Sequence, residues 1–299
     1  VVMETGITYA LAAALCWGTA PVLIKRGLRN SNVSAAVALQ QVGSVLIVVL
    51  IIALPFSEVQ ILMPWTAAGV FAAVGLVGSF LGRTFVLKGI DEVGVSKAQS
   101  ISNSAPLLTA IYAIVLLGET ATPLILIGVL LIVTGLLIIT RGTASSGDPQ
   151  RPLSFRMFLN PLLSVVFFGF GPILKKVAIL TGGTPIPGTL ITHATGLVLV
   201  MSFGRLLRID WREGVRTSTD SCFFFLLSGC FQGVGSILTY LAVVYAPTIV
   251  VAPIWNVQTL ITFSLARLLL RGDEAVGPKE GLAAVLVVAG VFFLFQSRT

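Results

Sequence analysis

Polar side chains gather on two stretches of an otherwise apolar sequence. Residues 94–108 read GVSKAQSISNSAPLL, and helical spacing places on one face Ser96, Gln99, Ser100 and Asn103. Residues 251–263 read VAPIWNVQTLITF, where one face carries Trp255, Thr259 and Thr262 and is flanked by Asn256 and Gln258. Amide and hydroxyl groups can bind a polar solute, or they can hydrogen-bond between helices as structural contacts. We expect these residues to line a cavity.

Basic and aromatic residues extend this candidate site. Lys97 lies within one turn of Gln99 and Arg83 follows Gly82, so either could bind a carboxylate or a phosphate. For the other basic residues near helix ends, Lys25, Lys175, Lys176 and Arg267, we expect the long side chain to reach the membrane surface. Trp17 and Tyr240 could face the same cavity, as could the weaker candidates Gln40, Gln41, Gln232 and Ser236.

Four prolines are predicted to bend or interrupt the helices beside this site. Proline removes an amide donor and clashes with the preceding turn, so it frees a backbone carbonyl. The predicted hinges are Pro21, Pro106, Pro172 and Pro253.

The acidic residues argue against several kinds of chemistry. All 12 Asp and Glu residues fall in predicted loops or at helix ends, and the chain holds one His and three Cys residues without metal-ligand spacing. HExxH, GxSxG and phosphate-loop motifs are absent from the sequence, so an intramembrane enzyme, a metal site and a cofactor site are all disfavoured. His193 could titrate near neutral pH, but a lone His more often makes a helix contact.

The composition places these residues in a membrane protein. The chain is 56% hydrophobic and only 10% charged, and its mean hydropathy is +1.00. Soluble domains carry roughly 25% charged residues, so a water-soluble globule is excluded, and the net charge of +7 needs no nucleic-acid partner. The N-terminus lacks the basic region of a signal peptide, so we expect its first apolar stretch to be retained.

Long charge-free runs predict an all-α integral membrane protein of ten transmembrane helices. A helix needs about 20 apolar residues to cross a bilayer, and the 46-residue run at 221–266 is divided at Ala246-Pro247. The predicted helices lie near 5–25, 33–54, 65–87, 94–117, 123–140, 159–180, 186–207, 222–245, 248–270 and 280–296.

The two halves of the chain show the marks of a duplication. WGTAPVLIK at 17–25 aligns with FGFGPILKK at 168–176, and the pair Gly78 and Gly82 aligns with Gly229 and Gly233, which we expect to mediate close helix packing. We predict a first repeat at 1–141, a connecting loop at 142–156 and a second repeat at 157–299. Because five helices is an odd number, the two repeats would be inverted.

The chain resembles the EamA-type ten-helix members of the drug/metabolite transporter superfamily. The resemblance rests on WGTAPVLIK and its second copy, and on the string at 104–139, in which a helix ends at Gly118-Glu119 and the next contains Gly128 and Gly135. It implies a carrier that works by alternating access, with the fourth and ninth helices lining its cavity, in a prokaryotic inner membrane. Family members handle amino acids, other metabolites, nucleotide sugars and sugar phosphates.

Basic residues at the rim of the expected cavity have no acidic partners, so they favour a zwitterion or an anion as the solute. An amino acid or related small metabolite is the first expectation. A nucleotide-sugar or sugar-phosphate exchanger is the alternative. The expected partners are this solute and the lipid bilayer, with the chain a monomer or a homodimer. Without a carboxylate at mid-membrane, we expect facilitated diffusion or exchange that is insensitive to a pH gradient.

The basic residues also predict an orientation. Sixteen of the 19 Lys and Arg residues fall on the odd-numbered predicted loops and their flanks, and short basic loops stay cytoplasmic, so both termini should be outside. In intact cells, an impermeant maleimide should therefore label a cysteine introduced at Ser297 and spare one at Gly147. The reverse labelling would refute this orientation.

Overall fold

The structure is a computed structural model that describes residues 2–54, 60, 62–93, 101–142, 155–204, 218–270 and 278–296. Throughout these residues the regular secondary structure is helical, which confirms the all-α prediction. Six of the helices are long and apolar enough to cross a membrane, and four shorter apolar helices accompany them.

The helices follow the predicted boundaries closely. In the first half they are α1 (Val2–Gly27), α2 (Val33–Ala53), α3 (Trp65–Val74), the π-helical segment η2 (Gly75–Gly82), α4 (Arg83–Val93), α6 (Ala105–Leu117) and α7 (Pro123–Gly142). In the second half they are α8 (Leu159–Leu180), α9 (Pro185–Phe203), α11 (Thr219–Tyr245), α12 (Thr248–Trp255), α13 (Gln258–Leu270) and α14 (Pro278–Gln296). Short 3-10 turns at Leu28–Asn30 and Phe155–Phe158 precede α2 and α8.

Helix starts are set by local polar groups and by proline. The Asn32 side chain accepts the backbone N–H of Ala35 at 2.8 Å and caps α2, and the Ser218 hydroxyl caps α11 in the same way. Pro247 has extended backbone angles directly before α12, so α11 and α12 are separate helices at the predicted position.

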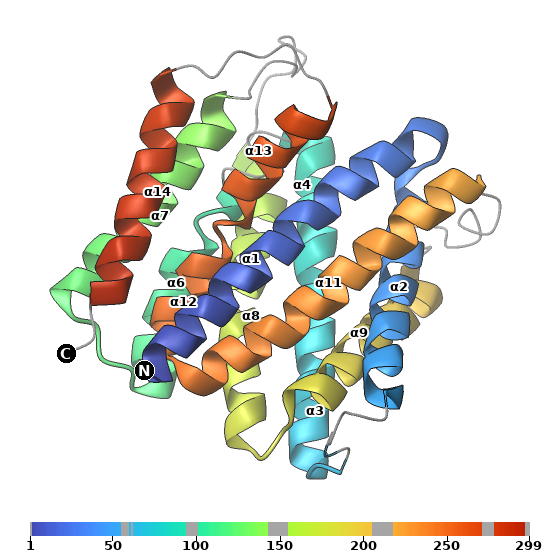
Figure 1. The fold of residues 1–299 in the computed structure, drawn as a ribbon, viewed down its shortest axis with the longest axis horizontal. Helices are drawn as coiled ribbons and strands as arrows, with labels where there is room; N and C mark the ends of the chain where they lie inside the picture. Colours follow the sequence, from blue (N-terminus) through green and yellow to red (C-terminus); the bar gives the residue numbers. More distant parts are fainter. Residues whose placement is uncertain are drawn as a thin grey trace.

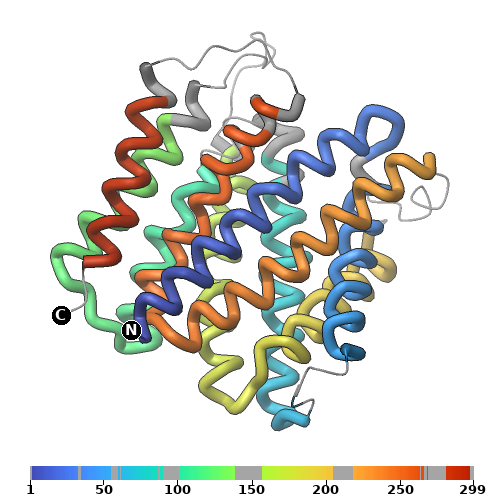
Figure 2. The backbone as a smooth tube through the Cα atoms, in the orientation of Figure 1, coloured from blue at the N-terminus to red at the C-terminus, as the bar shows by residue number. Residues whose placement is uncertain are grey.

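Helices from the two halves of the chain pack against one another in the bundle (Figure 1). α1 runs along α11, α2 packs on α11 and α9, and α8 packs on α6 and on the continuous rod of α3, η2 and α4. α7 and α14 pair at one edge, as the traces in Figure 2 show. α1 begins and α14 ends at the same end of the bundle.

Three predicted helices differ from the structure. The helix expected at 94–117 is interrupted by a turn at Asn103 and Ser104, and α6 begins only at Ala105. The helix expected at 248–270 is interrupted at Asn256 and Val257, where i to i−3 hydrogen bonds replace the helical pattern from three residues after Pro253. Pro253 has no N–H to give to the carbonyl one turn earlier, which weakens the helix there. The third helix continues to Val93 rather than ending near 87.

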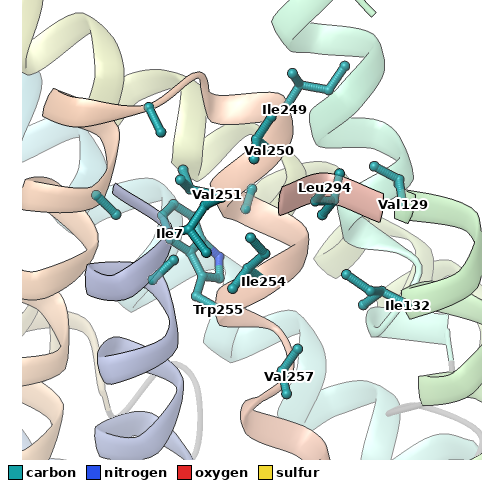
Figure 3. Packing of buried hydrophobic residues seen from close by; sticks show 14 of the residues in the cluster. Ile7, Val129, Ile132, Ile249, Val250, Val251, Ile254, Trp255, Val257 and Leu294 are labelled. Carbon is teal, nitrogen blue, oxygen red and sulfur yellow. The ribbon is translucent and has the colours of Figure 1, made fainter. Parts of the chain in front are cut away.

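An apolar cluster fills the end of the bundle at which the chain begins and ends. It joins the first half of α1 to α12, α11, α7 and α14 through buried side chains that include Ile7, Val129, Ile249, Val251 and Leu294 (Figure 3). All eight residues of α12 are buried. This end of the bundle is therefore filled by buried apolar side chains.

A carboxylate fixes α12 within this packed end. Gly118 ends α6 in the left-handed conformation (φ 65°), so the chain turns sharply and brings Glu119 to the start of α12. The two oxygens of Glu119 accept the backbone N–H groups of Thr248 and Ile249, each at 2.8 Å. These two amides belong to the unpaired first turn of a helix, where negative charge is stabilising.

Candidate functional site

A cavity of about 410 Å³ lies between the two halves of the chain, near the middle of most helices that line it. Each half contributes polar side chains to the wall: the first half supplies Gln40, Gln41, Ser79, Arg83, Ser102, Asn103 and Thr109, and the second supplies Lys175, Thr192, His193, Gln232, Ser236, Tyr240, Asn256 and Gln258. The aromatic part of the wall comes from Trp17, Phe168 and Trp255.

Eleven of the predicted site residues meet in this cavity. They are Trp17, Arg83, Asn103, Tyr240, Trp255, Asn256 and Gln258, together with the weaker candidates Gln40, Gln41, Gln232 and Ser236. The two tryptophans, from α1 and α12, lie edge to face with ring centroids 6.2 Å apart. Trp17 also donates its indole N–H to the carbonyl of Gln232 on α11, at 3.2 Å, which fixes the ring against the wall.

Other predicted site residues are not placed there. Ser96, Lys97, Gln99 and Ser100 lie outside the described residues. Thr259 is not part of the cavity wall, because the interruption at Asn256 and Val257 changes the helical phase between Trp255 and Thr259. On α13, Thr262 instead donates to the carbonyl of Gly18 at 2.8 Å and forms a contact with α1.

The four predicted hinge prolines have different local settings. Pro21 and Pro172 lie inside the continuous helices α1 and α8, and both line the cavity. Pro106 lies in the first turn of α6, directly after a turn at Asn103 and Ser104, so it begins a helix instead of bending one. Pro253 lies one turn before the break in the ninth predicted helix. Movement at these positions stays a prediction.

Lys175 is enclosed by aromatic rings at the centre of the cavity. Its ammonium nitrogen lies 4.8 Å from the ring centroid of Trp17, 5.1 Å from that of Tyr240 and 5.2 Å from that of Trp255. It donates to the hydroxyl of Thr239 at 2.7 Å, and the residue is only 9% exposed. The expectation that Lys175 reaches the membrane surface is wrong, because three ring faces hold the cation inside the protein.

A second cation, Arg83, lies at the end of a hydrogen-bonded chain. Its Nη1 donates to Oε1 of Gln40 at 2.7 Å, and Gln40 in turn donates from Nε2 to the hydroxyl of Ser228 at 3.1 Å. Arg83 is the first residue of α4, directly after the π-helical segment η2. Such segments are rare and often accompany functional sites, because the extra residue re-aims the side chains that follow.

The lone histidine is a hydrogen-bonded contact in the cavity wall. Its Nδ1 lies 3.0 Å from Oε1 of Gln41 and its Nε2 lies 2.9 Å from the hydroxyl of Ser236. A neutral imidazole with its proton on Nδ1 satisfies both contacts, donating to the amide oxygen and accepting from the hydroxyl. His193 thus joins α2, α9 and α11 and is close enough to Lys175 and Arg83 to interact with both charges.

Two glycines leave part of the cavity unfilled. A Cβ atom added to Gly78 or Gly171 would have nothing within 4 Å, and both residues line the cavity. The expectation that Gly78 packs against another helix is therefore wrong. Its predicted counterpart Gly229 does pack closely, because a Cβ there would collide with the backbone carbonyl of Gln40.

Sequence reasoning missed the central place of Lys175. The tandem Lys175 and Lys176 lie near the end of α8, where either chain could reach the surface. Consecutive helical residues point about 100° apart, so the two side chains cannot share one direction. Lys176 donates to the carbonyl of Val243 on α11, outside the cavity wall. The two adjacent lysines were therefore the available signal in the sequence that one of them turns inward.

The first half of the sequence matches a known protein family. The model of the EamA-like transporter family matches residues 4–141. This match is consistent with the drug/metabolite transporter superfamily. Together with the apolar helices it supports an integral, multi-pass membrane protein of the transporter type. No curated protein matches the chain in sequence.

A solved structure described as "Crystal structure of protein" shares the fold of this chain. The TM-score is 0.77 at 15% sequence identity, and the similarity covers 99% of each chain. At that identity, the likeness supports the arrangement of the helices and carries no information about the solute.

The contrast between the glycines gives a stability prediction. Gly78→Ala should leave the transporter as stable as before or stabilise it by about 0.5–1 kcal/mol, because the methyl group enters open space and alanine favours helix. Gly229→Ala should destabilise it by about 1–3 kcal/mol, because a backbone carbonyl must move. Thermal unfolding in detergent measures both. A Gly78→Ala variant as damaged as Gly229→Ala would contradict the open cavity.

Proposed function

We propose that the protein carries a small polar metabolite across the membrane by alternating access, with the central cavity as its solute site. The observation that carries this proposal is one cavity at mid-depth whose wall is shared by both halves of the chain and is rich in polar side chains. A purely structural core in lipid would satisfy its polar groups with one another and leave no volume of this size.

The proposed architecture is ten transmembrane helices in two inverted five-helix repeats. A pair of equivalent contacts supports it: Thr109 on α6 donates to the carbonyl of Gly169 on α8 at 2.9 Å, and Thr262 on α13 donates to the carbonyl of Gly18 on α1 at 2.8 Å. Gly18 and Gly169 are also equivalent in the sequence alignment of the two halves. Such symmetry gives a carrier two states of similar energy.

The packed end of the bundle supports one of those states. The apolar cluster around α12 closes the side of the chain termini, whereas cavity residues such as Ile24 and Val86 extend along α1 and α4 toward the opposite side. If the odd-numbered loops are cytoplasmic, as the basic residues predict, this is the state closed to the outside. We propose residence in a prokaryotic inner membrane with both termini outside.

An amino acid or a related zwitterion or anion is the proposed solute class, because the wall combines amide and hydroxyl groups with two cations. A nucleotide-sugar or sugar-phosphate exchanger is the second candidate, and the presence of Lys175 and Arg83 in one cavity is the observation that favours it. The hydrogen bonds of His193 support transport that is indifferent to a pH gradient, since both ring nitrogens already have partners.

Uptake into proteoliposomes tests the proposal. A thermal-shift screen of amino acids, organic acids, sugar phosphates and nucleotides should first identify a solute, since saturation at 100 times Kd stabilises the protein by about 2.7 kcal/mol. Asn103→Leu and Trp255→Ala should then reduce uptake of that solute by about tenfold or more, because each removes a group from the cavity wall.

The control is Trp65→Ala, which removes an equally large ring that is 92% exposed at the start of α3. It should leave uptake unchanged. Trp255→Phe, which keeps a ring at the cavity, separates loss of a contact from loss of folding. Normal uptake by both Asn103→Leu and Trp255→Ala would remove this cavity from the transport mechanism.

A further inference from the structure

The ammonium of Lys175 is held in place but its charge is not neutralised. Three ring faces and one hydroxyl surround it, and the hydroxyl of Thr239 takes one of its three N–H donors. Aromatic faces attract a cation through their quadrupole but bring no net charge. The cavity therefore presents a positive charge with hydrogen-bonding capacity to spare.

Arg83 adds a second charge of the same sign. One of its five N–H donors is given to the amide oxygen of Gln40, which is neutral. His193 lies close enough to interact with both cations, and its partners Gln41 and Ser236 are neutral as well. Within the described part of the wall, the two charges are approached by neutral groups alone.

The wall holds no carboxylate among the residues that the structure describes. Glu119 is already engaged by the backbone N–H groups of Thr248 and Ile249 at the packed end. A buried charge is strongly disfavoured unless an opposite charge meets it.

A zwitterion fits this arrangement poorly. The ammonium of an amino acid lies next to its carboxylate, so a carboxylate bound at Lys175 would bring a second cation beside the first. The rings of Trp17, Tyr240 and Trp255 could hold a cation, but they already enclose Lys175. A hydroxyl or carbonyl group at the same position meets no such repulsion and can bond to the amides of the wall.

We propose that the solutes of this carrier are organic anions without an ammonium group, carboxylates or phosphate monoesters, whose negative group binds Lys175 with Arg83 as the second cation. The proposal rests on the carrier function above and narrows its solute class. It also gives the aromatic enclosure a role: the rings fix the ammonium in the cavity while leaving its charge for the solute.

Matched pairs of solutes test the proposal in proteoliposomes. Malate and aspartate differ by a hydroxyl in place of an ammonium group, as do lactate and alanine, and glycerol 3-phosphate is compared with glycerol. Malate should compete for the site at least about tenfold more strongly than aspartate, and lactate more strongly than alanine by the same factor. Glycerol 3-phosphate should exceed glycerol in the same way. Comparison of malate with glycerol 3-phosphate shows whether carboxylates or phosphate monoesters are preferred.

The variants tie the preference to the named lysine. Lys175→Met should abolish the preference within each pair, and Lys175→Arg should retain it, because arginine keeps the charge. Lys176→Met is the matched control, since that lysine bonds to Val243 outside the cavity wall, and it should keep the preference. Melting temperatures identify any variant that fails to fold, in which case Arg83→Gln, which should weaken the same preference, replaces it.

The outcomes separate this inference from the carrier proposal. Uptake of alanine or aspartate at least as strong as that of lactate or malate would overturn the anion inference and leave the carrier standing. A preference that survives in Lys175→Met would also overturn it. If the anions stabilise the protein through Lys175 but do not cross the membrane, the anion site stands and the carrier proposal fails.

Discussion

A positive charge buried inside the helical bundle is the constraint on which the rest of the structure depends. The Lys175 ammonium can be tolerated there only if several helices bring polarisable or polar groups to it at once. Trp17 comes from α1, Tyr240 and Thr239 from α11, and Trp255 from α12, so helices from both halves converge on a single nitrogen atom. A ligand that engages this nitrogen acts on all of these helices together.

The backbone is interrupted where it borders the same cavity. The turn at Asn103 and Ser104 precedes α6, and the break at Asn256 and Val257 separates α12 from α13. Interrupted backbone at membrane depth is tolerated where it lines a cavity or is buried in protein. Half-helices can also shift relative to one another more easily than a continuous rod. Glu119 and the apolar cluster hold α12 in place on one side of the break. The hydrogen bonds of Glu119 do not extend to α13, on the other side of the break.

Much of the fold could be read from the sequence because its signals are local. Charge-free runs set the helices, Pro247 separated α11 from α12, and Gly118 marked the end of α6. Pro253 was predicted as a hinge, but the position of the break after Trp255 was not, because proline weakens a helix without determining the residue at which the chain leaves it. Thr259 was misplaced for that reason.

The site itself depended on tertiary contacts that spacing does not encode. Trp17 and Trp255 are far apart in sequence, and their pairing follows from the packing of α1 on α12. Gly78 could not be told from the packed Gly229, because each is followed by a second glycine four residues later and the two differ in what faces them. Lys175 could not be placed because an inward direction is costly unless rings from other helices are present to enclose the cation.

The central claim is that one cavity serves both sides of the membrane in turn, and a single cysteine tests it most directly. Gly171 faces open space in the cavity, so Gly171→Cys can be introduced after Cys16, Cys222 and Cys230 are replaced by alanine. In right-side-out and inside-out vesicles, an impermeant thiol reagent should modify this cysteine from either face, and the best-carried solute should slow the reaction from both. Modification from one face only, with the same rate in the presence and absence of solute, would contradict alternating access through this cavity.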